Sequence, residues 1–221
     1  MDLVGLAFPA IWQGAAFAIV VPLLGWVTWT APWRRFDVSE PVHVWFGTSF
    51  CLAGLWSIKA SLSSGLVFHL LGVSLLTLLA GPRLALIGTA VVVAMVTALR
   101  DGWWSNYALD VLAMGAVPVM VTAGALRAAE RWLSPNPFIY IFVVGFFGAA
   151  LAMFAAGIFA SAAVVLAGAL PASVVVEQFL PYLINLAFGE ATITGMLITL
   201  FVVYRPTWVA TFDAAHYLRS R

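Results

Sequence analysis

The sequence predicts an all-α, polytopic membrane protein, a helical bundle of about seven transmembrane helices. Of its 221 residues, 64% are hydrophobic and only 9% are charged, whereas a soluble domain is roughly 45–50% apolar and about 25% charged. The apolar residues also fall into seven stretches of about the 20 residues that a bilayer-spanning helix needs. No stretch has the composition of a soluble domain or a linker, so we expect a single transmembrane domain over residues 1–221.

The first three apolar stretches cover about Leu3–Thr30, Val42–Ile58 and Leu66–Ala80. The chain opens on Met1-Asp2 without the positively charged residues that begin a signal peptide. We therefore expect the first stretch to be a retained helix. The breaks between the three stretches are polar or rich in serine and glycine.

The remaining stretches cover about Leu84–Leu99, Tyr107–Leu126, Phe138–Leu170 and Val174–Tyr204. The third and fourth of the seven are slightly short, and a re-entrant hairpin is the alternative for them. Two crossings are favoured, because a hairpin would leave Arg83 near the middle of the bilayer, where an arginine is costly.

Charge asymmetry predicts an N-terminus outside the cell and a C-terminus in the cytoplasm, in a multi-pass protein of the inner (plasma) membrane. Cytoplasmic loops carry an excess of lysine and arginine. In this orientation the outer loops hold two such residues, Lys59 and Arg100. The inner segments hold eight: Arg34, Arg35, Arg83, Arg127, Arg131, Arg205, Arg219 and Arg221. Tryptophans near the predicted helix ends, such as Trp29, Trp45 and Trp132, are typical of an interfacial aromatic belt.

Small residues recur at every fourth position in two predicted helices. Such stripes allow close helix approach, either inside the bundle or against another membrane subunit. The first stripe is Ala10, Gly14 and Ala18, and the second is Gly148, Ala152, Ala156 and Ala160.

Four polar residues at predicted membrane depth are candidates for function, because polar groups are expensive there. They are His69, Asn106, Asp110 and Glu190. His69 is expected about one turn into the third helix. Asn106 and Asp110 are four residues apart and share a helix face. With Met1 and Asp2 they would lie toward the outer side, while Glu190 lies near the middle of the last helix. The alternative for each is a hydrogen bond that fixes helix packing.

The composition also excludes several functions. The only lysine is Lys59, which lies in no glycine-rich phosphate-binding motif, so uphill transport would need a separate ATPase. A net charge of +1 gives no indication of a nucleic-acid partner. We expect neither an enzyme nor an intrinsic cofactor.

Three motifs follow one another along the chain: Gly65–Gly72 with Gly81-Pro82, then Asp101-Gly102 with Ala108–Gly115, and finally Gly189–Thr194. These motifs resemble those of the CbiM/NikM-type proteins, the substrate-capturing membrane subunits of energy-coupling-factor cobalt and nickel importers, in a divergent permease-like branch. The likeness extends from about Leu66 to Tyr204.

The resemblance implies a metal site made of the N-terminal amine of Met1, the residue at position 2 and His69. The family has a histidine at position 2 where this chain has Asp2, and it usually has an asparagine in place of Asp110. Imidazole suits cobalt and nickel, whereas a carboxylate favours harder ions. Asp110, Glu190 and Asn106 are assigned supporting or coupling roles.

Two functions follow as hypotheses. In the first, the chain captures a divalent transition metal resembling cobalt or nickel, and separate ATPase subunits and a coupling transmembrane protein drive its uptake. In the second, the chain is a non-transporting accessory subunit of a larger membrane complex, and its small-residue stripes are interfaces. The replacement of the position-2 histidine by Asp2 fits the second hypothesis.

Overall fold

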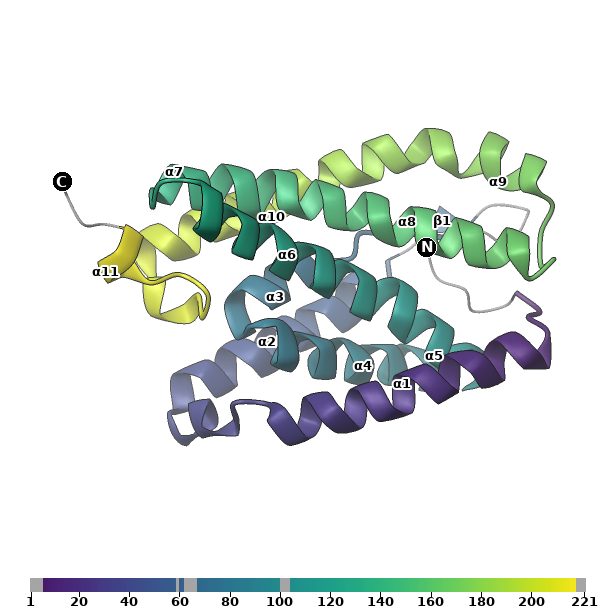
Figure 1. The fold of residues 1–221 in the computed structure, drawn as a ribbon, viewed down its shortest axis with the longest axis horizontal. Helices are drawn as coiled ribbons and strands as arrows, with labels where there is room; N and C mark the ends of the chain where they lie inside the picture. The colour runs from purple at the N-terminus through teal and green to yellow at the C-terminus, as the bar shows by residue number, and fades with distance from the viewer. Residues whose placement is uncertain (1–5, 59, 62–66, 100–103, 218–221) are drawn as a thin grey trace.

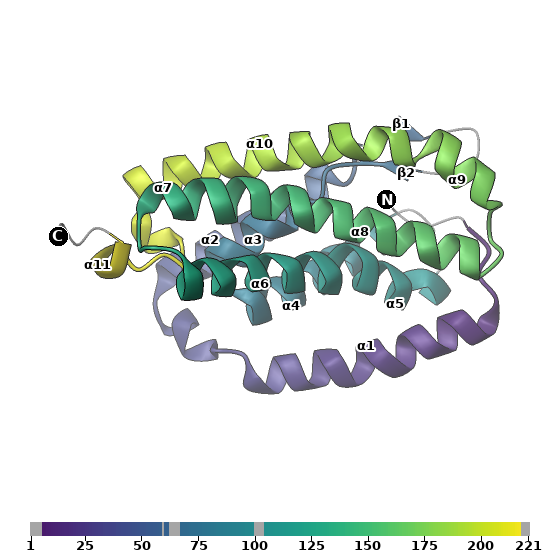
Figure 2. The same ribbon diagram turned by 45° about the horizontal axis from the view of Figure 1, so that its top comes forward.

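The computed structural model describes residues 6–58, 60–61, 67–99 and 104–217, and it shows long helices lying side by side in one bundle (Figures 1 and 2). The first half contains α1 (Ala10–Thr30), η1 (Trp33–Asp37), α2 (Ser39–Leu55), β1 (Ala60–Ser61), β2 (Val67–Phe68), α3 (Val73–Ala80) and α4 (Pro82–Ala98). The second half contains η2 (Trp104–Asn106), α5 (Tyr107–Asp110), η3 (Val111–Ala116), α6 (Val117–Trp132), α7 (Pro137–Ile139), η4 (Tyr140–Phe147), α8 (Gly148–Leu166), α9 (Ala172–Gln178), α10 (Leu180–Tyr204), η5 (Pro206–Trp208) and α11 (Ala214–Tyr217).

The helical membrane bundle predicted from composition is confirmed. Four continuous helices are long and apolar enough to cross a bilayer, namely Ala10–Thr30, Trp104–Trp132, Pro137–Leu166 and Leu180–Tyr204. A fifth apolar helix, Pro82–Ala98, is shorter. The count of seven crossings, and the side of the membrane on which each terminus lies, stay predictions.

The predicted third helix is wrong in its first half. Residues 67–72 form β2 and an extended segment, and α3 comprises only Val73–Ala80. The helix cannot extend backward because Gly72 has a left-handed backbone, with φ of +65°. Every residue of α3 is buried. Val67, His69 and Leu71 of the extended segment are buried as well, which agrees with the rule that non-helical backbone is tolerated at membrane depth only where protein encloses it.

The predicted last helix is divided at Phe179 into α9 and α10. Pro181 lies in the first turn of α10, where its missing N–H costs nothing because the first amides of a helix have no intrahelical acceptor. Inside one continuous helix the same proline would remove a hydrogen bond. The break therefore follows from the position of Pro181.

One end of the bundle gathers the loop after α1, the turn between α3 and α4, and the segment after α10. Arg35 links all three, because its guanidinium donates to the Ala80 carbonyl at 3.3 Å and to the Ala210 carbonyl at 3.1 Å.

The position of Trp45 differs from the interfacial aromatic belt that the sequence predicts for it. Its indole is buried and donates to the Leu84 carbonyl at 2.8 Å, so it contributes to the core rather than to an aromatic belt.

The two small-residue stripes have different environments. The stripe in α8 is buried, and α8 packs against both α6 and α10. The stripe in α1 is exposed along its length at Ala10, Gly14 and Ala18. Internal packing therefore explains the stripe in α8, while the stripe in α1 lies on the surface of the chain.

Candidate metal-binding site

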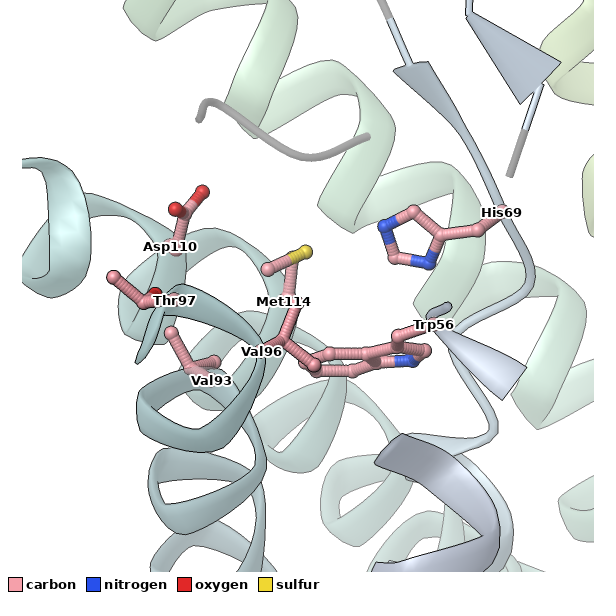
Figure 3. Close-up of a pocket in the computed structure, with 7 residues that line it drawn as sticks. All are labelled: Trp56, His69, Val93, Val96, Thr97, Asp110 and Met114. Carbon is pink, nitrogen blue, oxygen red and sulfur yellow. The ribbon is translucent and has the colours of Figure 1, made fainter. Parts of the chain in front are cut away.

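A small cavity of about 10 Å³ lies where α2, the extended segment 67–72, α4 and the α5–η3 helix meet (Figure 3). It is about large enough for one water molecule or a single ion. Its lining combines an imidazole, a carboxylate and a thioether with apolar groups. The residues are Trp56, His69, Val93, Val96, Thr97, Asp110 and Met114.

Glu190 on α10 holds the extended segment in place. One carboxylate oxygen accepts a hydrogen bond from the Leu71 amide at 2.9 Å, and the other accepts from the Gly72 amide at 2.7 Å. The side chain is buried. Each unpaired backbone amide at this depth would cost several kcal/mol in hydrocarbon, so this carboxylate allows the chain to stay extended here.

Two further contacts fix the same segment. The buried Trp56 indole, at the end of α2, donates to the Leu71 carbonyl at 2.9 Å. On α10, Gly189 lies against Leu70, where an added Cβ would meet the Leu70 side chain at 3.2 Å. The adjacent pair Gly189-Glu190 thus has two functions: the glycine permits close approach, and the glutamate accepts the amide hydrogens.

The extended segment presents His69 to the cavity. The imidazole is 5% exposed and lies 5.4 Å from the Trp56 ring between centroids. Its Nδ1 is 3.0 Å from the Leu70 carbonyl oxygen. A carbonyl only accepts, so Nδ1 carries the proton in the neutral ring and Nε2 carries the lone pair. Histidines that bind metals usually donate their other N–H to a carbonyl or carboxylate in this way.

Asp110 and Met114 approach the cavity from the opposite side to His69. Figure 3 shows the Met114 sulfur between the Asp110 carboxylate and the imidazole, above the Trp56 ring. Asp110 is 1% exposed, at the last residue of α5, and Met114 lies in the π-helical turn η3. A carboxyl oxygen, an imidazole nitrogen and a polarisable sulfur therefore surround a volume of ionic size.

Asn106 does not line the cavity but anchors the segment before α1. It is fully buried, and its amide nitrogen donates to the Leu6 carbonyl at 2.9 Å. Its amide oxygen accepts from Gln13 at 3.2 Å, and Gln13 also donates to the Phe8 carbonyl. Asn106 therefore ties the N-terminal segment to the helix that carries Asp110.

The structure thus brings together His69 and Asp110, with Glu190 and Asn106 as supports. Met1 and Asp2 lie outside the described residues. Among the residues that are described, no group of three or more histidine, cysteine, aspartate or glutamate side chains forms a metal site. Sequence reasoning placed His69 in a helix, which is wrong because the segment is extended. It also gave no role to Trp56, Thr97, Gln13 or Met114, although Met114 lies within the Ala108–Gly115 motif.

Comparison with known proteins adds a family and a fold. A family model for the cobalt uptake substrate-specific transmembrane region matches residues 6–208. The crystal structure of a truncated transition metal transporter has a TM-score of 0.73 at 17% identity, covering 92% of this chain and 98% of that one. A second transition metal transporter has a TM-score of 0.68 at 18% identity, covering 99% and 97%. No curated protein matches the sequence.

Proposed function

Because the chain belongs to the CbiM family and is a membrane component of metal uptake rather than an enzyme, we propose that it captures a divalent transition metal at the His69 cavity. In this proposal the metal, of the cobalt or nickel type, is the substrate. The chain is the substrate-binding subunit of an energy-coupling-factor importer in the inner (plasma) membrane.

The observation that carries the proposal is the orientation of the His69 imidazole. Its Nδ1–H is engaged by the Leu70 carbonyl, beside a cavity of ionic size. The ring is held by an extended segment whose amides are bonded to Glu190. This fixed geometry favours metal capture over a purely structural histidine, because a positioned neutral imidazole is a common transition-metal ligand.

The N-terminus is proposed to complete the ligand set with the Met1 amine and the Asp2 carboxylate. Asn106 fixes the Leu6 carbonyl. Five residues of extended chain span at most roughly 18 Å, so the terminal amine stays within that radius of Leu6. An amine, an imidazole and a carboxylate together neutralise part of the charge of a divalent ion.

The choice of ion follows from the ligands. Asp2, at the position of a family histidine, adds a carboxylate to the ligand set, and carboxylates favour hard ions. His69 and the neighbouring Met114 thioether favour transition metals. We propose that the chain retains transition-metal preference but binds cobalt or nickel more weakly than a set with two imidazoles would.

Uphill movement requires other subunits in this proposal. The chain has no nucleotide-binding motif, so separate ATPase subunits supply the energy through a coupling transmembrane protein. The exposed stripe of Ala10, Gly14 and Ala18 on α1 is the proposed contact with that coupling protein, since small residues let helices approach closely.

A metal titration of the purified chain tests the proposal. Wild type should bind cobalt or nickel, His69→Ala should abolish binding, and Asp2→His should tighten it. His43→Ala is the matched control, because the exposed His43 lies on α2 and lines a different groove. Thermal melting checks that each variant folds.

If wild type binds no divalent metal between pH 6 and 8, or if His69→Ala binds as well as wild type, metal capture is refuted. The accessory-subunit hypothesis would then lead. Co-purifying subunits, identified in the same preparation, would show which larger complex contains the chain.

A further inference from the structure

A second, much larger cavity lies at the arginine-rich end of the bundle. Its volume is about 660 Å³, within the range of about 300–1,000 Å³ typical of small-molecule sites. It is formed by the second half of α1, η1, the turn from α3 to α4 with the start of α4, residues 119–127 of α6, and residues 210–211.

Three guanidinium groups line this cavity, each from a different element. Arg35 comes from η1, Arg83 from the first turn of α4 and Arg127 from α6. The lining contains no aspartate or glutamate. Within the described ranges, none of the three arginines forms a salt bridge with a carboxylate. The cavity is therefore electropositive.

Two of the arginines are positioned by contacts that leave their charge uncompensated. Among the described residues, Arg35 donates to the backbone carbonyls of Ala80 and Ala210 and to no carboxylate. The Arg83 guanidinium lies over the Trp26 ring, 5.8 Å from its centroid, in a cation–π contact. Neither contact supplies a negative charge.

The remaining wall is apolar and belongs to helices that cross the membrane. Trp26 on α1 is 58% exposed and Met120 on α6 is 63% exposed. Leu23, Val27, Val119 and Ala123 complete this wall. Both helices are within the candidate spans Ala10–Thr30 and Trp104–Trp132. The cavity is thus polar where the arginines gather and apolar along the bilayer.

We propose that this cavity binds an anionic phospholipid, with its phosphate among Arg35, Arg83 and Arg127 and an acyl chain against α1 and α6. Charge complementarity selects the negative headgroup, since arginine binds phosphate through several N–H donors. The apolar wall selects a lipid over a soluble anion or an acidic protein segment, neither of which would cover Trp26 and Met120. Basic pockets between transmembrane helices bind anionic headgroups by the same physics.

Native mass spectrometry in a neutral detergent tests the proposal. The full chain is titrated with dioleoyl phosphatidylglycerol, and with dioleoyl phosphatidylcholine and inorganic phosphate in parallel. We expect one tightly retained phosphatidylglycerol, weaker phosphatidylcholine adducts, and no displacement by millimolar phosphate. The double variant Arg83→Gln/Arg127→Gln should bind phosphatidylglycerol roughly 25-fold more weakly, at about five-fold per arginine.

Two controls separate lipid binding from folding. Arg131→Gln lies one turn beyond Arg127 on α6, outside the cavity, and should bind phosphatidylglycerol as wild type does. Arg83→Lys/Arg127→Lys keeps the charge and should recover most of the affinity. The melting temperature without lipid checks each fold.

Three results would overturn the lipid assignment. The first is phosphatidylcholine binding as tightly as phosphatidylglycerol. The second is full retention of phosphatidylglycerol by the double glutamine variant. The third is displacement of the lipid by free phosphate at millimolar concentration. If a synthetic acidic peptide, and not the lipid, stabilised wild type and lost this effect in the double variant, the cavity would instead be a contact for a protein partner.

Discussion

The Glu190 carboxylate on α10 accepts a hydrogen bond of 2.7 Å from the amide of Gly72, 118 residues earlier in the chain. With the bond to Leu71, this contact replaces the backbone partners that a continuous helix would have supplied. A long-range contact made by the buried Glu190 therefore determines the local conformation on which the His69 site depends.

Removing the Glu190 carboxylate should release the extended segment. Glu190→Ala leaves the Leu71 and Gly72 amides without acceptors, at about 1–3 kcal/mol for each one that water cannot reach. We expect a lower melting temperature and weaker metal binding. Glu190→Gln, which keeps one acceptor oxygen, should lie between Ala and wild type. Glu177→Gln, at an exposed position on α9, is the matched control. Unchanged melting of Glu190→Ala would contradict the structural role of this side chain.

Replacing Gly72 by alanine should lower the free energy of unfolding more than the same replacement at another glycine of similar backbone conformation. Gly72 has φ of +65°, and an added Cβ would collide with the Leu52 side chain. Gly168 has φ of +69° with no atom within 4 Å of an added Cβ. Gly168→Ala should cost roughly 1–2 kcal/mol from the backbone alone, whereas Gly72→Ala adds a steric clash. Chemical or thermal unfolding of both variants measures the difference, and equal destabilisation would show that the clash is relieved.

Neutralising Asp110 should weaken metal binding without abolishing it. Asp110→Asn preserves the shape of the side chain but removes the buried carboxyl group beside the cavity, and with it the negative charge that could balance a bound cation. We expect about ten-fold lower affinity for a divalent ion, and a smaller loss than His69→Ala causes, given typical charge interactions at several ångströms. Asp37→Asn, at the exposed end of η1, is the control. Isothermal titration measures both, and equal affinity in Asp110→Asn and wild type would exclude Asp110 from the site.

Metal affinity should rise with pH. A histidine ligand must be neutral and an amine ligand must be unprotonated, and their ordinary pKa values are about 6.5 and about 7.7–8.0. Protons therefore compete with the metal below these values, and affinity should increase from pH 6 to pH 8. Titrations at fixed ionic strength test this. Affinity that is constant over this range would contradict coordination by His69 and the Met1 amine.

The predicted orientation is open to a labelling experiment. With Cys51, which is exposed, replaced by alanine, single cysteines at Ser105 and Ser134 occupy opposite ends of the fifth predicted helix. A membrane-impermeant thiol reagent added to intact cells should label Ser105→Cys and not Ser134→Cys. The opposite pattern would invert the bundle and place the arginine-rich end outside.

The helical bundle and the burial of its polar residues could be predicted from the sequence. The backbone conformation around these residues and the groups that they contact could not. Apolar length identifies a helix such as Ala10–Thr30 directly, and the cost of polar groups in lipid singled out His69 and Glu190. It could not reveal that residues 67–72 are extended, because an apolar run has the same composition in either conformation. The partners of Glu190 are backbone amides, which every residue carries, so no motif could identify them.

The π-helical turn η3, Val111–Ala116, interrupts the α-helical geometry of the span Trp104–Trp132 and therefore affects mutagenesis along that span. A π-turn inserts about one extra residue per turn into an α-helix. The angular positions of side chains before and after it therefore belong to two different helical wheels. A scanning-mutagenesis series along Trp104–Trp132 will show one periodicity up to Asp110 and another, displaced in phase, from Val117 onward. An alignment that ignores this offset would assign lipid-facing and site-facing positions of α6 to the wrong residues.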